Sequence, residues 1–516
     1  MKNKNYIKHC LLACMLIPML SSCNDWLAVE MEDGMMEDQL YRDNEGYKAV
    51  LNGVYAKMNE NYSTTLTMGV LDVMAQYYNV RKNSNHRFYV YANYNFSDAT
   101  FEKSNGSVWT SQYDQIANLN TLLEHIDAGD SGISPLYYNV IKGEALALRG
   151  FLHFDLLRLY GPIYNESSEN VICIPYQESS SKEIQPLLTA KVVMDKVIRD
   201  LKAAADLLEN DPIRTKGVMA EESDDPNENS DFRFRQYRLN YYAVQVLLAR
   251  AYMWVGDKTK ALDIVRNLIA ENEENLVFPW TPKTDVQNTE TPDRLFSTEV
   301  MFALYNNKRV SLFDSYFKKT ASVSSILSFK GETIASLEGK IPHFYSETND
   351  LRRGSNFWSE EVLEQSSSLG SSTQKAICFS KYADVSTPKP YRYMIPLIRM
   401  SEVYLMAAEC TDNLSEAIGY INKVRGNRNC VNLELQTSDT KESIQTYITD
   451  EFTREVIGEG QLYFYYKRLA MDEILSGSTF EEDWWSGDWI ITDNISLQDY
   501  VWPLPKIEID KRVNDN

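Results

Sequence analysis

The residues that could do acid–base or metal chemistry are not arranged in any catalytic pattern. Four histidines lie beyond residue 22, each isolated in the sequence: His86, His125, His153 and His343. The chain has no HExxH pair, no GxSxG elbow, no P-loop and no GxGxxG turn after a predicted strand. Its 73 acidic residues leave open a pair of glycosidase carboxylates, but no motif selects one. We therefore predict no catalytic residue, no metal site and no cofactor, and a protein that is not an enzyme.

One acidic stretch has the alternation of a calcium-binding loop. Asp225, Asn227, Asn229 and Asp231 occupy alternate positions. The glycine at the sixth position and the bidentate glutamate at the twelfth are missing, although a loop of this kind needs both for its turn and its ion shell. We predict that this stretch is an acidic surface insertion without calcium.

Aromatic residues are the feature that stands above background, with 33 Tyr, 19 Phe and 9 Trp. Sugars present flat C–H faces that stack on such rings, and their hydroxyls pair with Asn, Asp, Gln or Arg side chains. Aromatic residues in helices are predicted to be core residues, whereas those in polar, turn-rich stretches belong either to the core or to a ligand platform. Composition and placement, without a motif to fix the positions, suggest nine ligand-binding candidates: Tyr89, Tyr91, Tyr94, Phe313, Tyr316, Tyr345, Trp358, Trp484 and Trp485.

The N-terminus has the pattern of an export signal that ends in a lipidation site. Lys2, Lys4 and Lys8 precede a short apolar run at residues 11–20, which is too short to span a bilayer. The sequence Leu-Ser-Ser then leads into Cys23 and resembles the lipobox of bacterial lipoproteins. The resemblance implies diacylation of the cysteine thiol through a thioether, cleavage before this residue and acylation of its new amine. Several acyl chains on one residue anchor a protein stably in a membrane.

The chain is acidic, with a formal net charge of −21. A surface of this sign repels nucleic acid and anionic lipid, so we predict neither as a ligand. The charge is compatible with a neutral or cationic ligand, and equally with simple solubility.

Four cysteines lie downstream of the lipidation site, at wide spacing: Cys173, Cys378, Cys410 and Cys430. Four cysteines allow three disulfide connectivities, and the sequence leaves these open. We favour thiols that are buried as small apolar side chains.

The ligand-binding candidates need a framework, and the strongest helix is predicted at residues 141–164. Apolar side chains recur there on a 3.6-residue period from Leu148 to Leu159, and Gly161-Pro162 ends the pattern. Charged residues occupy the other faces, so the pattern predicts a long, half-buried amphipathic helix. Further helices are predicted at residues 45–58, 108–126 and 190–208.

Two stretches have the pattern of helix–turn–helix repeats. Residues 239–270 match tetratricopeptide consensus positions, with the turn at Gly256, and residues 400–425 repeat the pattern. Because such repeats form a continuous core only when three or more of them stack, we expect further pairs at 45–126 and at 190–208. The predicted fold class is mostly α, an α-solenoid of tetratricopeptide-like helical repeats.

Polar, aromatic stretches between the helices predict a second layer of long loops with minor β-structure. Residues 77–100 are predicted to be loop with short extended pieces, and residues 299–381 to be long loops with short helices and strands, among them a strand at 301–305. We predict a signal peptide at 1–22, a lipidated tether at 23–40 and a single domain at 41–516, with its loop-rich layer at 299–395 and 475–500.

Four motifs follow one another along the chain. Residues 141–164 contain GEA and FLHFDLLRLYGP, residues 348–354 read TNDLRRG, and residues 451–460 read E-x-x-R-E-x-x-x-E-G. Residues 503–509 then read PLPKIEI. In this order the motifs resemble the SusD/RagB family of outer-membrane lipoproteins.

The helix predicted at residues 451–468, which contains the third motif, departs from the family pattern. Phe452, Leu462 and Tyr465 stand where charged residues are usual. This difference predicts a changed ion-pair network at that helix.

The resemblance implies a mostly helical lipoprotein, anchored on the outer face of the outer membrane, that captures a nutrient without chemistry. The ligand would be an oligosaccharide or glycan, and the partner a SusC-like, TonB-dependent channel. The helical repeats would face the channel and the loop layer would hold the ligand. Three alternatives remain: a helical-repeat scaffold lipoprotein, a member that binds peptide instead of glycan, and a secreted hydrolase. The long aromatic loops favour ligand capture over the scaffold.

Overall fold

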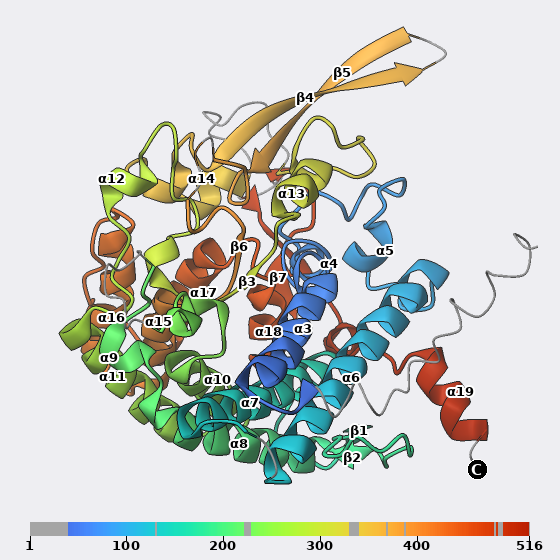
Figure 1. Cartoon of the computed structure of the whole chain (residues 1–516). Coiled ribbons are helices and arrows are strands. Elements are labelled where there is room, and N and C mark those ends of the chain that lie inside the picture. The colour runs from blue at the N-terminus through green and yellow to red at the C-terminus, as the bar shows by residue number, and fades with distance from the viewer. Residues whose placement is uncertain are drawn as a thin grey trace, which may run out of the picture.

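The computed structural model describes residues 40–129, 132–220, 229–329, 340–367, 370–385, 387, 389–478, 481–482 and 489–514. Helices make up most of it and follow a broad curve (Figure 1), which confirms the predicted fold class. Cys23, the predicted signal peptide and nearly all of the predicted tether lie outside the described residues, as do Asp225, Asn227, Trp484 and Trp485.

The curve consists of helices that each pack against the next. It passes from α3 and α6 through α7 and α8 to α10, α11, α15, α16 and α17 (Figure 1). Their bounds are α3 (Asn44–Tyr62), α6 (Ala99–Asp127), α7 (Pro135–Tyr160), α8 (Ala190–Leu207), α10 (Tyr241–Trp254), α11 (Lys258–Asn275), α15 (Met400–Cys410), α16 (Leu414–Asn427) and α17 (Lys441–Glu455). The additional pairs expected in the first half of the chain are therefore present.

Both predicted repeats form helical pairs. Between α10 and α11, Gly256 has φ +82°, a left-handed conformation that glycine adopts without a steric penalty. Asp257 then caps α11 by accepting a hydrogen bond from the backbone N–H of Lys260 at 3.1 Å. Asn413 caps α16 in the same way. The local turn chemistry thus explains why the two patterns were readable from the sequence.

Helix α7 lies at the centre of the core. The sequence predicts a half-buried helix, but every residue from Gly143 to Tyr160 is buried. The physical reason is that α3, α6, α8 and α10 all pack against α7, so no face of it is left to solvent. Pro135 stands at its start, and the helix ends before Gly161 as predicted.

Polar residues of α7 are buried together with partners. The Nε of Arg149 donates to Asp200 Oδ2 at 2.6 Å. His153 Nδ1 lies 2.9 Å from the carbonyl of Arg149, and His153 Nε2 accepts a hydrogen bond from the backbone N–H of Gln177 at 3.0 Å. The His153 ring is therefore a neutral Nδ1–H tautomer, and burial lowers its pKa to about 3.

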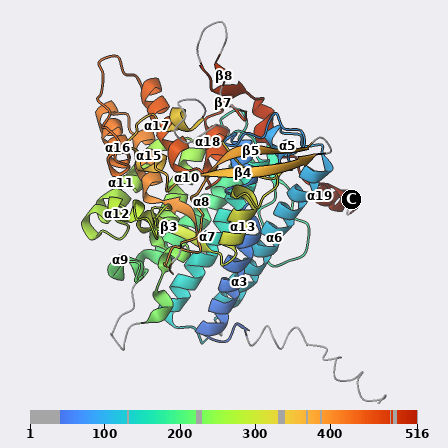
Figure 2. The ribbon, with the colours of Figure 1, turned by 90° about the horizontal axis from the view of Figure 1, so that it is seen from above.

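Most of the β-structure belongs to the layer above the curve, whereas the short pair at residues 172–174 and 188–189 packs against α7 and α8. Strand β3 (Val300–Tyr305) pairs antiparallel with β6 (Met394–Arg399), which confirms the strand predicted at 301–305. The largest β-element is the hairpin of β4 (Trp358–Ser367) and β5 (Gly370–Phe379), which projects from the body (Figures 1 and 2). The sequence predicts only short strands here. The base of the hairpin is buried, with Trp358, Ile377 and Phe379 in the core. Because its outer part projects from the body, that part needs no apolar face, so the alternation that marks a strand is missing there.

The stretch 77–100, all of which the structure describes, contains no strand. It folds as turns around one helical turn, α5 (Tyr89–Ala92), and ends at the start of α6. The prediction of short extended pieces in this stretch is therefore wrong. The remaining helices are α4 (Val70–Met74), α9 (Ile213–Lys216), α12 (Lys283–Val286), α13 (Arg309–Phe317), α14 (Lys340–Phe344), α18 (Gln461–Arg468) and α19 (Lys506–Asn514). The remaining strands are β1 (Ile172–Ile174), β2 (Leu188–Thr189), β7 (Glu473–Leu475), β8 (Glu481–Glu482), β9 (Trp489–Ile490) and β10 (Thr492–Asn494).

Within the described part of the chain, no helix is both long enough and apolar enough to cross a membrane.

Candidate ligand-binding surface

Five of the nine aromatic candidates lie in the core. They are Tyr91, Tyr94, Phe313, Tyr345 and Trp358, each less than 9% exposed. Their polar atoms are bonded to the chain: Tyr94 Oη donates to Met74 O at 2.6 Å, and Trp358 Nε1 donates to Arg352 O at 2.9 Å. These five rings offer no face to a ligand, so we leave them out of the candidate site.

Tyr89 and Tyr316 are half-buried and keep part of their surface. They come from segments more than two hundred residues apart, which backbone contacts hold together. The backbone N–H of Arg87 donates to Ser324 O at 2.8 Å, and that of Asn79 donates to Ser328 O at 2.9 Å. The structure therefore brings the 77–98 and 309–329 stretches to one end of the molecule, beside the β4–β5 hairpin (Figures 1 and 2).

The centre of this region is the guanidinium of Arg87. Its carbon lies 5.0 Å from the ring centroid of Phe88 and 5.2 Å from that of Tyr316. The Phe88 and Tyr316 rings are 5.8 Å apart, and Phe88 is followed by Tyr91 at 6.0 Å. The exposed cation and ring are thus held in place by a row of aromatic contacts that leads into the core.

The same 77–98 segment also contributes polar side chains. The side-chain amide of Asn93 donates to the carbonyls of Arg81 and Tyr89, both at 3.0 Å. Arg81 Nη1 lies 3.2 Å from Asp493 Oδ2. We define the loop surface by five residues: Arg81, Arg87, Tyr89, Asn93 and Tyr316. It combines ring faces with guanidinium and amide groups, an arrangement that can bind a hydroxylated ligand without chemistry.

The sequence prediction found the two tyrosines of the loop surface but missed Arg87, Arg81 and Asn93. A usable signal was the run Arg87-Phe88-Tyr89, which places a cation next to two rings. The pairing with Tyr316 has no sequence signal, because it depends on the contact between two distant loops.

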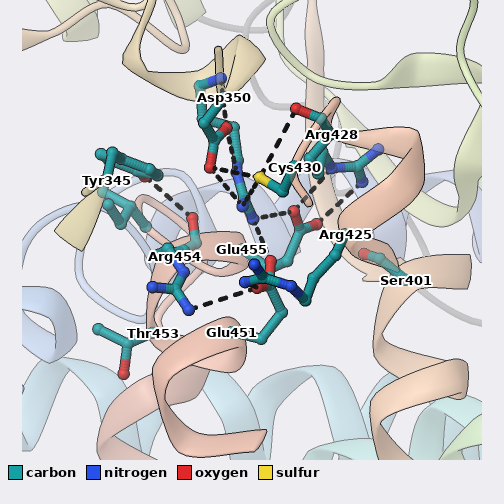
Figure 3. Close-up of polar contacts among 12 residues, drawn as sticks. Tyr345, Asp350, Ser401, Arg425, Arg428, Cys430, Glu451, Thr453, Arg454 and Glu455 are labelled. Carbon is teal, nitrogen blue, oxygen red and sulfur yellow. Dashed lines mark hydrogen bonds and ion pairs between the residues drawn. The ribbon is translucent and has the colours of Figure 1, made fainter. Parts of the chain in front are cut away.

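A second polar cluster contains the motif residues near 350 and 451. It forms a buried ion network of Glu299, Asp350, Arg352, Lys381, Arg399, Arg428, Glu451, Glu455 and Glu459. All of these side chains are at least nine-tenths buried. Figure 3 shows Asp350, Arg428, Glu451 and Glu455 from this network, with the neighbouring Arg425 and Cys430.

Within the network, Arg352 and Glu455 join the most distant segments. Arg352 donates to Asp350 in its own loop at 2.7 Å, and to Glu451 and Glu455 on α17 at 2.6 and 2.7 Å. Glu455 also accepts from Arg399 Nη1 at 2.8 Å and Arg428 Nε at 2.7 Å. Each charge has a partner of opposite sign, so the network clamps the loop layer to the end of the curve and leaves none of these described groups for a ligand.

The charges of this network set the ionisation of Glu455. Burial alone would raise its pKa, but the cations of Arg428, Arg399 and Arg352 outweigh burial and hold the pKa well below the ordinary value. Close by, Phe452 and Tyr465 stack with centroids 4.6 Å apart and an interplanar angle of 18°. An aromatic contact thus stands at the positions where the sequence predicts a changed ion-pair network.

The four downstream cysteines are free thiols, with Cys173, Cys378 and Cys410 buried and Cys430 half-buried. In the described ranges no group of His, Cys, Asp and Glu side chains could hold a metal ion. Asn229 caps a short 3-10 helix by accepting from the backbone N–H of Asp231, whose side chain pairs with Lys48 at 2.6 Å.

Comparison with known proteins gives matches along most of the chain. A family model described as "Starch-binding associating with outer membrane" matches residues 25–219, and a model described as "SusD family" matches residues 282–514. A curated relative, SusD-like protein P38 of Formosa agariphila, is 23% identical over 497 residues, which cover 89% of this chain and 90% of the relative.

Solved structures share the fold at low sequence identity. A SusD superfamily protein from Bacteroides thetaiotaomicron is 21% identical with a TM-score of 0.62, over 92% of this chain and 98% of that one. A SusD-like carbohydrate binding protein from Bacteroides vulgatus is 18% identical with a TM-score of 0.63, over 92% of this chain and 97% of that one.

Proposed function

Since the chain belongs to the SusD/RagB family, whose members bind ligands and are not enzymes, we propose that it is an outer-membrane-associated protein that captures a neutral oligosaccharide on the loop surface. The observation that carries the proposal is the contact between Arg87 and Tyr316. The ring of Phe88 packs against Tyr316 and holds the pair in position. The Arg87 guanidinium lies over the Tyr316 ring, so the pair places a hydrogen-bond donor for sugar hydroxyls next to an aromatic surface for the C–H groups of one sugar unit.

Charge supports a neutral ligand. Arg81 is paired with Asp493, and the chain as a whole carries a net charge of −21. An anionic glycan would meet this overall repulsion, whereas a neutral one would not. The polar neighbours of the rings can exchange hydrogen bonds with hydroxyls, and hydrogen bonds give such a site its specificity.

Anchoring and delivery are part of the same proposal. Lipids on Cys23 would hold the protein at the outer membrane, on the cell surface, and the acidic segment after Cys23 would lift the domain off the lipid. The ligand would pass to a SusC-like, TonB-dependent channel, with the helical curve as the surface facing it, because stacked helices offer a broad binding face. Purification of the lipidated protein from its own membranes tests the partner, and a protein that never co-purifies with an outer-membrane channel contradicts it.

Titration calorimetry of the mature chain from Asn24 tests ligand capture. The panel consists of neutral oligosaccharides of the starch, xylan, mannan and laminarin classes, with peptides of similar mass. We expect saturable binding to one glycan class, and a loss of about tenfold or more in affinity for Arg87→Ala, which removes a hydrogen-bond donor, and for Tyr316→Ala, which removes the aromatic surface. Tyr138→Ala, a half-buried tyrosine at the start of α7, is the matched control and should bind normally.

Three results would contradict the proposal. They are no binding of any glycan in the panel, saturable binding of peptides alone, or glycan binding that is unchanged in both Arg87→Ala and Tyr316→Ala. Circular dichroism of each variant separates loss of a contact from loss of the fold.

A further inference from the structure

Three tyrosines from separate parts of the chain meet at a surface that the sequence did not single out. The rings of Tyr237 and Tyr305 are 5.7 Å apart, and those of Tyr305 and Tyr393 are 5.5 Å apart, both edge to face. Tyr305, at the end of β3, is 54% exposed, and the other two are half-buried. Tyr237 Oη donates to Pro390 O at 2.7 Å, which fixes its ring. We call these three residues the tyrosine platform.

The platform is joined to the wall of a cleft of about 560 Å³, because the hydroxyl of Tyr237 donates to the carbonyl of Pro390, which lines that cleft. Gln236, the residue before Tyr237, and Tyr391, two residues before Tyr393, also line the cleft. The lining also includes residues just after α11, the segment around α12 and the start of β3. The volume falls within the range of about 300–1,000 Å³ that is typical of small-molecule sites.

One buried group in the cleft calls for a hydrogen-bond donor. Gln236 is only 5% exposed, and its side-chain oxygen is buried with no hydrogen-bond partner among the described residues. A buried acceptor without a donor costs free energy, so native structures rarely leave such an acceptor without a hydrogen bond. A ligand hydroxyl entering the cleft would supply that donor.

The charges of the cleft disfavour an anion. Asp285 and Asp293 line it, with Lys389 as a single cation among the described lining residues. At the platform, Arg392 is engaged by Asp384 through two contacts of 2.8 Å. The described lining thus offers no guanidinium to a phosphate or carboxylate, and it is rich in hydroxyl and amide groups.

From these features we propose a second saccharide site, in which a neutral oligosaccharide of a few units stacks on the tyrosine platform and places a terminal hydroxyl against Gln236. The ligand class rests on the function proposed above, but the residues do not overlap. The two sites lie towards opposite ends of α13: Arg309 at its start donates to Tyr391 O at 3.1 Å, whereas Tyr316 near its end belongs to the loop surface. A rise of 1.5 Å per residue separates these two positions by roughly 10 Å along the helix.

Native mass spectrometry and calorimetry with neutral trisaccharides test the proposal, with maltotriose, xylotriose, mannotriose and laminaritriose as probes. We expect two bound trisaccharides per chain for the class that binds. The double change Tyr305→Ala and Tyr393→Ala should remove the trisaccharide bound at the platform, and Gln236→Leu should weaken binding at that same site about tenfold. Changing Arg87 and Tyr316 to alanine should remove the other.

Each other outcome separates the two proposals. One bound trisaccharide that disappears with the loop-surface changes and survives the platform changes overturns the second site and leaves the first. One that disappears only with the platform changes supports the second site and overturns the first. No binding of any trisaccharide overturns both. Tyr138→Ala serves again as the matched control, and unfolding temperatures of the variants show whether Gln236→Leu retains the fold.

Discussion

Replacing Glu455 by glutamine tests the buried ion network most directly. The amide keeps the size of the side chain but removes its charge. Glu455 accepts hydrogen bonds from Arg352 Nη1, Arg399 Nη1, Arg428 Nε and Arg428 Nη2 at 2.7, 2.8, 2.7 and 3.0 Å. The substitution replaces one carboxylate oxygen by an amide nitrogen, which donates hydrogen bonds and cannot accept them. The arginine N–H groups that donate to that oxygen would therefore lose their acceptor.

The expected loss in the free energy of unfolding is about 3 kcal/mol. Removing one partner of a buried ion pair costs about 3–5 kcal/mol, because the other charge stays buried. Each arginine here retains another carboxylate, since Arg352 keeps Asp350, Arg399 keeps Glu459 and Arg428 keeps Glu299. This residual pairing places the estimate at the lower end of the range.

Urea unfolding of the mature chain measures the loss, with Glu416→Gln as the control. Glu416 pairs with Arg266 at 2.7 Å, but both side chains are substantially exposed, so that pair should contribute less than about 1 kcal/mol. Equal midpoints for Glu455→Gln and Glu416→Gln would refute the reasoning.

The pH dependence of the difference adds a second readout. The folded-state pKa of Glu455 lies well below its unfolded value, so the stability it contributes is complete above the unfolded pKa of about 4.3. That stability is lost as pH falls towards the folded pKa. The gap between the wild type and Glu455→Gln should therefore shrink below about pH 4. A gap that stays constant down to pH 3 would show that the charge of Glu455 is not what stabilises the fold.

Three further predictions concern other parts of the chain. Burial lowers the pKa of His153 to about 3, so NMR should find its ring neutral at pH 5. The stability that the neutral ring contributes is complete above the unfolded pKa of about 6.5 and is lost as the pH falls from there towards 3. A ring that titrates near pH 6.5 in the folded protein contradicts this prediction. Gly460 has φ +70°, and a Cβ at this position would lie 2.2 Å from Leu66 O. Gly460→Ala should therefore lower the free energy of unfolding by about 2 kcal/mol or more. Gly53 lies within α3 and a Cβ there meets open space, so Gly53→Ala should raise the free energy of unfolding by up to about 1 kcal/mol. Cys23→Ala should abolish incorporation of labelled fatty acid and release the protein from membranes, and continued labelling would rule out Cys23 as the lipid attachment site.

Helical periodicity, turn residues and motif order are local properties, and the sequence determined what depends on them. The end of the helix before Gly161, the turn at Gly256 and the strand at 301–305 all formed as predicted, because a few neighbouring residues specify each of them. The family resemblance likewise rests on short motifs in a fixed order. Even for α7, however, the periodicity gave the helix but not its complete burial, which its neighbours impose.

Only the tertiary structure decided which aromatic rings reach solvent. Trp358 and Tyr316 both lie in polar, turn-rich sequence, but Trp358 is covered by Phe329 and Phe379, while Tyr316 keeps a surface beside Arg87. The same holds for the tyrosine platform. Its exposed member, Tyr305, lies in a strand whose apolar sequence predicts a core position. Exposure of a ring depends on contacts between segments far apart in the chain, and the spacing of residues along the chain does not record those contacts.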